Sequence, residues 1–233
     1  MDSNRRISDL KSYSCTMKDA LLNKGVDHLH YMAPLATMPL IAAQGILSYN
    51  CRLRIAQSPQ MQELLEALGS RSIADPLVQM RRHCRTVDGV SVHDMVPLYF
   101  AVHTPMQYVV TRDSSTTIAF AEVDVEKVFS INGTLFTNGN AAADDTSFYN
   151  TVEGLREIDW SIVFKRRGSS KKYKRLKCAE VLVPDMIPQD AITRYVFMTN
   201  VAERKFWQLI ETVRNVCPIG GDIETKVDES HFF

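Results

Sequence analysis

The sequence lacks the glycine-rich motifs that mark the commonest nucleotide-binding folds. No G-x-G-x-x-G follows a predicted strand, and no G-x-x-x-x-G-K-[S/T] is present. A Rossmann dinucleotide site and a P-loop are therefore excluded as hypotheses. The chain also lacks an uninterrupted run of about 18 apolar residues, which a membrane-spanning helix requires. We therefore expect a soluble, cytoplasmic protein with no membrane partner.

Cysteine is too scarce and too scattered to organise the fold. The five cysteines are odd in number and include no C-x-x-C pair, so neither a disulfide framework nor a zinc knuckle is indicated. His28 with His30, and the adjacent His83 and Cys84, are the remaining candidates for metal ligands. No H-E-x-x-H motif or second cysteine pair accompanies them, and we predict no metal site.

A formal net charge of zero conceals an uneven distribution of charge. Eight of the 27 Lys and Arg residues lie between positions 165 and 177, a segment without any acidic residue. A local cationic segment on an otherwise acidic chain is typical of a protein that attracts a polyanion to one place. A solvated loop without a binding role is the alternative, and charge alone does not decide between the two.

The 233 residues, 45% of them hydrophobic, suffice for one substantial core. We expect an N-terminal extension over residues 1–28 and a single domain over residues 29–233. The apolar patterns predict strands at 29–32, 96–101, 117–123, 159–164, 178–183 and 192–198, and helices at 15–23, 34–44, 60–68, 74–83, 105–109 and 202–213. Gly45 is the predicted stop of the second helix. Because strands and helices do not alternate regularly, the fold class is α+β and not a doubly wound parallel sheet.

Two charged residues stand out in their local context. Glu180 lies near the start of an apolar strand, where a buried carboxylate is costly unless a partner compensates it. By strand alternation it either faces solvent or is buried for a chemical purpose. Arg82 follows Arg81 near the end of a predicted helix, where two exposed cations also suit the helix dipole. Pattern alone leaves both residues undecided.

Several blocks of the sequence resemble, in the same order, the DarT family of DNA ADP-ribosyltransferases. These blocks are S-I-A-D-P (72–76) with Q-M-R-R (79–82), H-D-M-V-P-L-Y-F (93–100) with T-P-M-Q-Y (104–108), F-T-N-G-N-A (136–141) with F-Y (148–149), residues 155–160, and K-C-A-E-V-L-V-P (177–184). The resemblance covers about residues 29–200. It implies a PARP-like ADP-ribosyltransferase fold, with split antiparallel or mixed β-sheets flanked by helices. It also implies a toxin that uses NAD⁺ to modify thymidine or guanosine in single-stranded DNA.

Matched position by position, the catalytic glutamate of the family falls on Glu180 and its essential arginine on Arg82. A carboxylate beside the ribose stabilises the positive charge that develops when the nicotinamide bond breaks, and a guanidinium holds the NAD⁺ phosphates or that carboxylate. An alignment without a gap puts Tyr31, Ala33 and Thr37 at the family's NAD⁺-binding positions, whereas a gap puts His30 on the histidine position. The full set of candidate NAD⁺ contacts is His30, Tyr31, Met32, Ala33, Thr37, Ser48, Tyr99 and Phe100.

The basic segment ends three residues before Glu180, and the corresponding loop of ADP-ribosyltransferases helps to select the target. We therefore expect the backbone phosphates of single-stranded DNA to bind Lys171, Lys172, Lys174 and Arg175, and a base to stack on Tyr173.

Family resemblance further implies a monomer and a macrodomain antitoxin that removes ADP-ribose. Two other hypotheses stay open at this stage. One is a degenerate ADP-ribosyltransferase-fold module that binds nucleic acid without turning over NAD⁺. The other is a transferase that modifies RNA or protein.

Overall fold

A computed structural model describes residues 16–69, 73, 76–112, 116–166, 168 and 170–233. Eight strands form one mixed sheet in the order β12-β11-β6-β1-β5-β9-β7-β8, in which every neighbouring pair is antiparallel except β11 and β12. These strands are β1 (His28–Pro34), β5 (Met95–Tyr99), β6 (Ile118–Asp124), β7 (Leu135–Thr137), β8 (Phe148–Tyr149), β9 (Glu180–Pro184), β11 (Ile192–Phe197) and β12 (Thr225–Val227). Two smaller pairs join β2 (Ile46–Leu47) to β10 (Met186–Ile187) and β3 (Thr86–Val87) to β4 (Val90–Ser91). The predicted α+β class is confirmed.

The sheet is narrowest where β1 meets β5. Every residue of β1 pairs with β6, and every residue of β5 pairs with β9. In contrast, a single register pair, His30 with Tyr99, joins β1 to β5. The sheet therefore consists of two halves, β12-β11-β6-β1 and β5-β9-β7-β8, which meet at one point.

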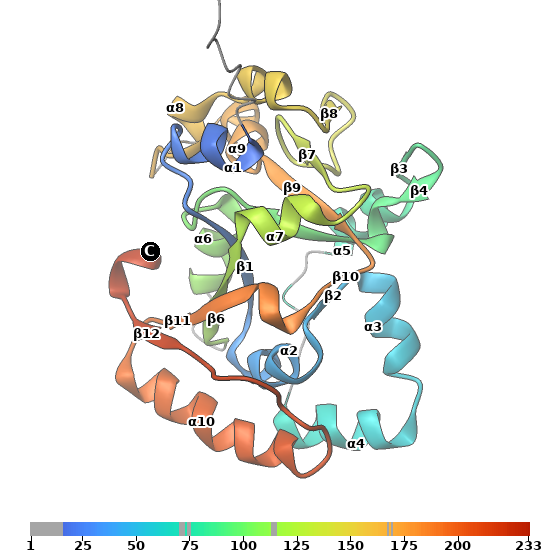
Figure 1. Ribbon diagram of the computed structural model, residues 1–233, viewed down its shortest axis with the longest axis vertical. Helices are drawn as coiled ribbons and strands as arrows, with labels where there is room; N and C mark the ends of the chain where they lie inside the picture. The colour runs from blue at the N-terminus through green and yellow to red at the C-terminus, as the bar shows by residue number, and fades with distance from the viewer. Residues whose placement is uncertain (1–15, 70–72, 74–75, 113–115, 167, 169) are drawn as a thin grey trace, which may run out of the picture.

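Helices cover the two halves separately (Figure 1). The helix α10 contacts β11 and β12 and packs on α2 and α4 at one end of the molecule, whereas α1 packs on α7, and α8 on α9, towards the other end. The α-helices are α1 (Met17–Leu22), α2 (Met38–Gln44), α3 (Tyr49–Ile55), α4 (Pro59–Leu68), α5 (Pro76–His83), α6 (Pro105–Arg112), α7 (Val125–Ser130), α8 (Trp160–Val163), α9 (Lys171–Lys177) and α10 (Asn200–Arg214). Five 3₁₀ helices add η1 (Leu35–Thr37), η2 (Val92–Asp94), η3 (Val152–Glu157), η4 (Gln189–Ala191) and η5 (Glu229–His231) among the described residues. No helix in the described part of the chain has the length and apolarity needed to cross a bilayer.

The main core lies on one face of the sheet, where alternate strand residues meet the helices. Leu29, Tyr31 and Ala33 of β1 join this core, as strand alternation requires. Leu21 and Val26, which the sequence analysis assigned to an N-terminal extension, are fully buried in the same cluster. From Thr16 onwards, therefore, the segment before β1 packs as part of the domain.

Most predicted elements are confirmed, including the strands at β6 and β11 and the helices at α4 and α10. Gly45 ends α2 with φ +77°, and a Cβ there would collide with the carbonyl oxygen of Ile187. The predicted strand at 159–164 is wrong, because residues 160–163 form the helix α8. Its N-cap, Asp159, accepts a hydrogen bond from the amide of Ile162, and that local bond outweighs the β propensity of the apolar run.

Candidate functional site

A row of polar side chains crosses the sheet at its narrow point. Glu122 of β6 is directly opposite His30 of β1, His30 is opposite Tyr99 of β5, and Tyr99 is opposite Glu180 of β9. Directly opposed residues project from the same face of a sheet, so the four side chains share the face that lies away from the main core. This polar row connects the two halves of the sheet.

At one end of the row, Arg82 and Glu180 form a buried ion pair. Nη1 of Arg82 donates to both carboxylate oxygens of Glu180 at 3.1 Å, and the two residues are only 8% and 1% exposed. The backbone amide of Ala141 donates to Oε1 of Glu180 at 2.7 Å. The prediction that this arginine and this glutamate meet is confirmed, and Glu180 is not the solvent-facing strand residue that alternation also allowed.

The two partners reach each other from elements far apart in the sequence. Arg82 lies in the last turn of α5 and is the buried residue of that helix, whereas the neighbouring Arg81 is exposed. Glu180 begins β9, where its amide donates to the hydroxyl of Thr137 on the adjoining strand β7. The hydroxyl of Thr137 in turn donates to the carbonyl oxygen of Gly139, which holds the turn that presents the Ala141 amide.

The surroundings of the ion pair are apolar. Burial raises the pKa of Tyr99 well above its usual value, with the Glu180 carboxylate adding to the effect. Burial likewise raises the pKa of the Cys178 thiol to about 12, so this cysteine is neutral and unreactive at physiological pH. Nη2 of Arg82 is also buried and has no hydrogen-bond partner within the described residues. A buried guanidinium nitrogen of this kind is a donor available to a bound anion or carbonyl group.

A hollow of about 470 Å³ lies beside the pair and does not contain it. Its lining includes Arg81 and Ala142, the chain neighbours of Arg82 and Ala141. The predicted meeting of Arg82 and Glu180 is therefore a closed contact and not one across an open cleft, because each buried charge is compensated by the other. The remaining lining residues are Met80, Cys84, Arg85, Thr86 and Asp144.

The structure divides the candidate NAD⁺ contacts between the two faces of the sheet. His30, Met32 and Tyr99 share the face of Glu180, since they alternate with the core-facing positions. In contrast, Tyr31, Ala33 and Phe100 are buried in the main core cluster. These three stay predictions as NAD⁺ contacts, and the structure places their side chains in the main core.

The other two candidates lie at helix termini. Ser48 is fully buried, and its hydroxyl accepts from the amide of Cys51, so that it caps α3. Thr37 ends the 3₁₀ helix η1 immediately before α2 and is half-buried. Both stay predictions as NAD⁺ contacts.

Residues 171–177 of the basic segment form a helix, α9, and not a loop. Ser170 caps it by accepting from the amide of Tyr173. Its lysines at 171, 172 and 174 are exposed and form no ion pair within the part of the chain that the structure describes, whereas Lys177 is buried and donates to the carbonyl oxygen of Val163. One helix therefore carries exposed cations on one side and a buried cation on the other.

Two predicted DNA contacts of this segment are engaged within the protein. The Arg175 guanidinium lies 2.9 Å from the Asp145 carboxylate, and the hydroxyl of Tyr173 donates to the carbonyl oxygen of Lys165 at 2.9 Å. A Cβ at Gly168 would lie within 2.5 Å of the Tyr173 ring, so that ring already packs on backbone. Both side chains help to hold α9 in place, and their role as DNA contacts stays a prediction.

The sequence analysis did not identify two parts of this site. The Ala141 amide, which fixes Glu180, belongs to the F-T-N-G-N-A block, where the Asn138-Gly139 turn was the available signal. The other part is Glu122, which joins the polar row from β6 and bonds to His231 near the C-terminus. No local pattern links those two positions, because 109 residues separate them.

The family model described as "ssDNA thymidine ADP-ribosyltransferase, DarT" matches residues 51–233 of this chain. A comparison with curated proteins gives no match. Among solved structures, Thermus sp. 2.9 DarT in complex with ADP-ribosylated single-stranded DNA is similar with a TM-score of 0.71 at 17% identity, covering 90% of this chain and 97% of that chain.

Two further structures share this architecture. Thermus sp. 2.9 DarT in complex with NAD⁺ gives a TM-score of 0.67 at 17% identity, with 89% of this chain and 98% of that chain covered. Thermosipho africanus DarTG in complex with ADP-ribose gives 0.69 at 20% identity, covering 88% of this chain and 51% of that chain. At these identities the likeness establishes the fold, which is the ADP-ribosyltransferase fold expected from the sequence.

Proposed function

The chain belongs to the DarT family of single-stranded DNA thymidine ADP-ribosyltransferases, and we propose that it transfers ADP-ribose from NAD⁺ to a thymine base of single-stranded DNA. The observation that carries this proposal is the buried pair of Arg82 and Glu180, held by the Ala141 amide at the junction of the two half-sheets. A carboxylate held in a buried site by a guanidinium, with a further guanidinium donor available, suits a reaction that develops positive charge on a sugar.

In the proposed reaction the bond between nicotinamide and C1′ of its ribose breaks, and nicotinamide leaves as a neutral molecule. The negative charge of Glu180 stabilises the oxocarbenium-like sugar. A ring nitrogen of the base then bonds to C1′, and its proton passes to the Glu180 carboxylate as general base. The products are neutral nicotinamide and the ADP-ribosylated base, and the proton released by the base is on Glu180, so charge and protons balance.

Arg82 has two tasks in this proposal. Its Nη1 orients the carboxylate through the two bonds at 3.1 Å, and its Nη2, without a partner among the described residues, is available to a phosphate oxygen of NAD⁺. His30, Met32 and Tyr99 lie on the same face of the sheet, and we assign NAD⁺ contact to them.

The exposed lysines of α9 supply the proposed DNA contact. Lys171, Lys172 and Lys174 project from a helix that ends three residues before Glu180. Their charges attract backbone phosphates whatever the sequence. A single strand suits the site because its bases need not be unstacked from a duplex, which would cost a few kcal/mol.

Tyr31 and Ala33 differ from the residues that the family usually has at these NAD⁺-binding positions, and this difference is the reason for considering an inactive module. Both residues belong to the hydrophobic core and not to the face of Glu180, which supports an active enzyme over the inactive alternative. A macrodomain antitoxin, a monomeric state and a cytoplasmic location stay predictions from family resemblance.

The direct test is to incubate the protein with NAD⁺ and a mixed-sequence single-stranded oligonucleotide and to weigh the DNA by mass spectrometry. We expect one ADP-ribosyl increment on thymine-containing strands, and none on matched strands in which every thymine is replaced. The duplex and an RNA of the same sequence serve as parallel acceptors. An increment on RNA alone, or on no acceptor while the folded protein binds DNA, would contradict the proposal.

A further inference from the structure

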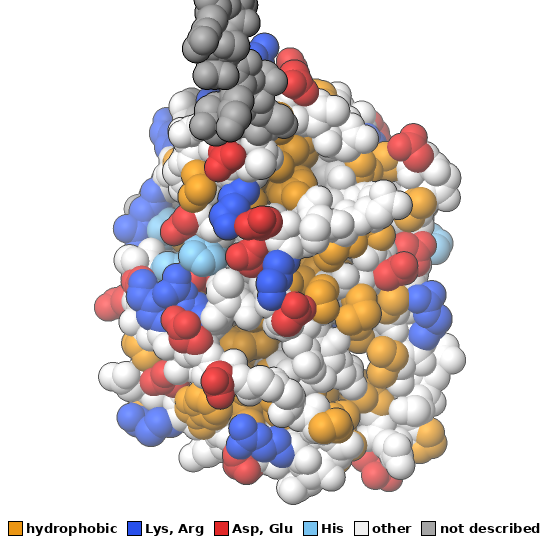
Figure 2. Space-filling view, in the orientation of Figure 1, with side chains coloured by type: hydrophobic (Ala, Val, Ile, Leu, Met, Phe, Trp, Pro, Cys, Tyr) orange, Lys and Arg blue, Asp and Glu red, His pale blue; other side chains and the backbone are white. Residues whose placement is uncertain are grey.

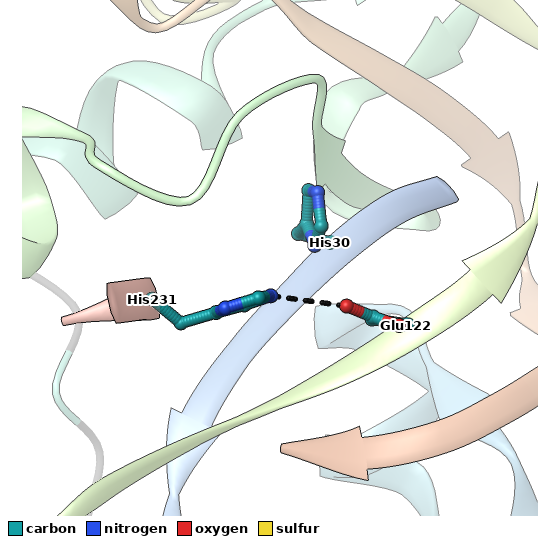
Figure 3. Close-up of side chains that lie close together, drawn as sticks. All are labelled: His30, Glu122 and His231. Carbon is teal, nitrogen blue, oxygen red and sulfur yellow. Dashed lines mark hydrogen bonds and ion pairs between the residues drawn. The ribbon is translucent and has the colours of Figure 1, made fainter. Parts of the chain in front are cut away.

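A second cluster of chemically competent side chains lies at the other end of the polar row. His30 of β1, Glu122 of β6 and His231 of η5 each direct one nitrogen or oxygen atom into a common space, and these atoms all lie within 4.8 Å of one another. Figure 3 shows the two imidazole rings and the carboxylate approaching from three different segments of the chain. The sequence analysis considered His30 only with His28 and found no metal site.

Two of the three side chains are already oriented by further partners. Nε2 of His231 lies 3.0 Å from Oε1 of Glu122, and its other nitrogen, Nδ1, lies 3.4 Å from the carboxylate of Asp228. The second oxygen of Glu122 accepts from Nε of Arg194. Metal sites in proteins characteristically have this outer layer, in which a carboxylate orients the histidine ligand and a donor orients the carboxylate ligand.

His30 lacks such a partner in the described part of the chain. Its Nδ1 is buried, and no group there forms a hydrogen bond with it. The nearest rings are those of Phe120 and His231, at centroid distances of 6.4 and 5.9 Å, and neither accounts for a buried polar nitrogen.

We propose that His30, Glu122 and His231 form a binding site for a divalent transition metal of the zinc class. Two imidazole nitrogens and one carboxylate oxygen are a donor set that zinc accepts, with a fourth position left for water. In a tetrahedral zinc site the ligand atoms lie about 3.3 Å apart, given bonds of about 2.0–2.1 Å. The pair of Glu122 and His231 already has this separation, so loading requires mainly that the His30 ring closes on it.

The bound metal would fasten the C-terminal segment to the centre of the sheet. His231 precedes Phe232, which packs with Met32 and Phe120 on the face opposite the main core. In the space-filling view, histidine side chains reach the surface near the C-terminal end of the chain, among side chains of both charges (Figure 2). The side chain of His231 is 16% exposed, so the cluster lies at the edge of the buried region.

A cluster with a purely structural role is the competing interpretation. The contacts of His231 with Glu122 and Asp228 would then be hydrogen bonds that need no metal. This interpretation does not explain the buried nitrogen of His30, which a metal would satisfy. The two interpretations predict different results. Only a metal site makes the folded protein take up zinc in a way that depends on the side chains of the cluster.

The test is equilibrium dialysis of the full chain against Zn²⁺ at pH 7, without NAD⁺ or DNA, with bound metal measured by mass spectrometry. We expect about one zinc per chain, with the dissociation constant raised at least tenfold in His231→Ala and in Glu122→Gln. His28→Ala is the matched control, because His28 lies on the same strand and face but outside the cluster, and it should bind zinc as the unchanged protein does.

A second readout covers the case in which a variant folds poorly. Zinc at a hundredfold excess over its dissociation constant raises the folding equilibrium constant about a hundredfold, which denaturant titration detects in the unchanged protein and in His28→Ala. Absence of zinc uptake by the folded protein, or uptake that survives both His231→Ala and Glu122→Gln, would overturn the proposal. Since no substrate is present, this result is independent of the transferase assay.

Discussion

Glu180, buried in its pair with Arg82, and the exposed lysines of α9 lie close together in the sequence but hold their charges in opposite ways. Glu180 is compensated by a guanidinium and a backbone amide, whereas Lys171, Lys172 and Lys174 face solvent. Charges in an apolar site interact strongly and are fixed in direction, and charges in water are screened over about 10 Å at 0.1 M salt. Under the proposed function, the first region suits a chemical step and the second suits the attraction of a polyanion.

The largest effect expected from this difference is that of Glu180→Gln. The amide keeps the shape but removes the negative charge and the proton acceptor, so the rate of transfer should fall about 10²–10⁴-fold, while DNA affinity changes little. Single-turnover kinetics with saturating NAD⁺ and oligonucleotide measure the rate. Glu153→Gln is the matched control, because Glu153 is exposed; an equal loss in both variants would remove Glu180 from the chemistry.

Arg82→Met tests the buried pair through stability. Removing one partner leaves the other charge buried without compensation, so the free energy of unfolding should fall by about 3–5 kcal/mol, as measured in urea. Arg81→Met, on the exposed neighbour, should stay within about 0.5 kcal/mol. Adding Glu180→Gln to Arg82→Met should restore part of the loss, and a double variant that is no more stable than Arg82→Met alone would contradict the pairing.

Neutralising the exposed lysines should affect binding and not chemistry. In the triple variant Lys171→Ala, Lys172→Ala and Lys174→Ala, the slope of log affinity against log salt for single-stranded DNA should decrease by about 2, since each phosphate contact contributes about 0.7. The KM for NAD⁺ should stay unchanged. A control pair at exposed positions of α10, at the other end of the molecule, is Arg204 and Lys205, and its neutralisation should leave the slope as it is.

The smallest effect concerns Lys177, the buried cation of the same helix. Burial lowers its pKa from 10.5 to about 8, so between these pH values the unfolded chain binds a proton that the folded chain does not. The free energy of unfolding should therefore rise with pH across this window. Lys177→Met removes the rise, which denaturant titrations at pH 7.5 to 10.5 detect, whereas the exposed Lys174→Met should retain it.

Much of this fold was predictable from local pattern. The strands at β6 and β11 and the helix α10 follow from periodicity, and Gly45 ends α2 as expected. The prediction at 159–164 was wrong because the apolar run suits either a strand or a helix, and the cap at Asp159 decides for the helix.

For the candidate site, too, some features could be predicted from the sequence and others could not. Glu180 and Arg82 were identified by resemblance to a family, and the structure confirms that they meet. The NAD⁺ contacts could not be assigned, because a shift of one residue along β1 exchanges the core face for the site face. In the structure, the pairing of His30 with Tyr99 shows which side chains of β1 lie on the same face of the sheet as Glu180.

By itself the sequence determined the α+β class and the position of the cationic segment, since these depend on short-range pattern, and its resemblance to a family singled out Arg82 and Glu180. Tertiary structure decided which arginine is buried, which face each strand residue occupies and which distant residues share a cluster. His30, Glu122 and His231 show the reason most clearly. They come together only because β1 pairs with β6 and the C-terminal segment packs beside both, and that proximity depends on how the whole chain folds.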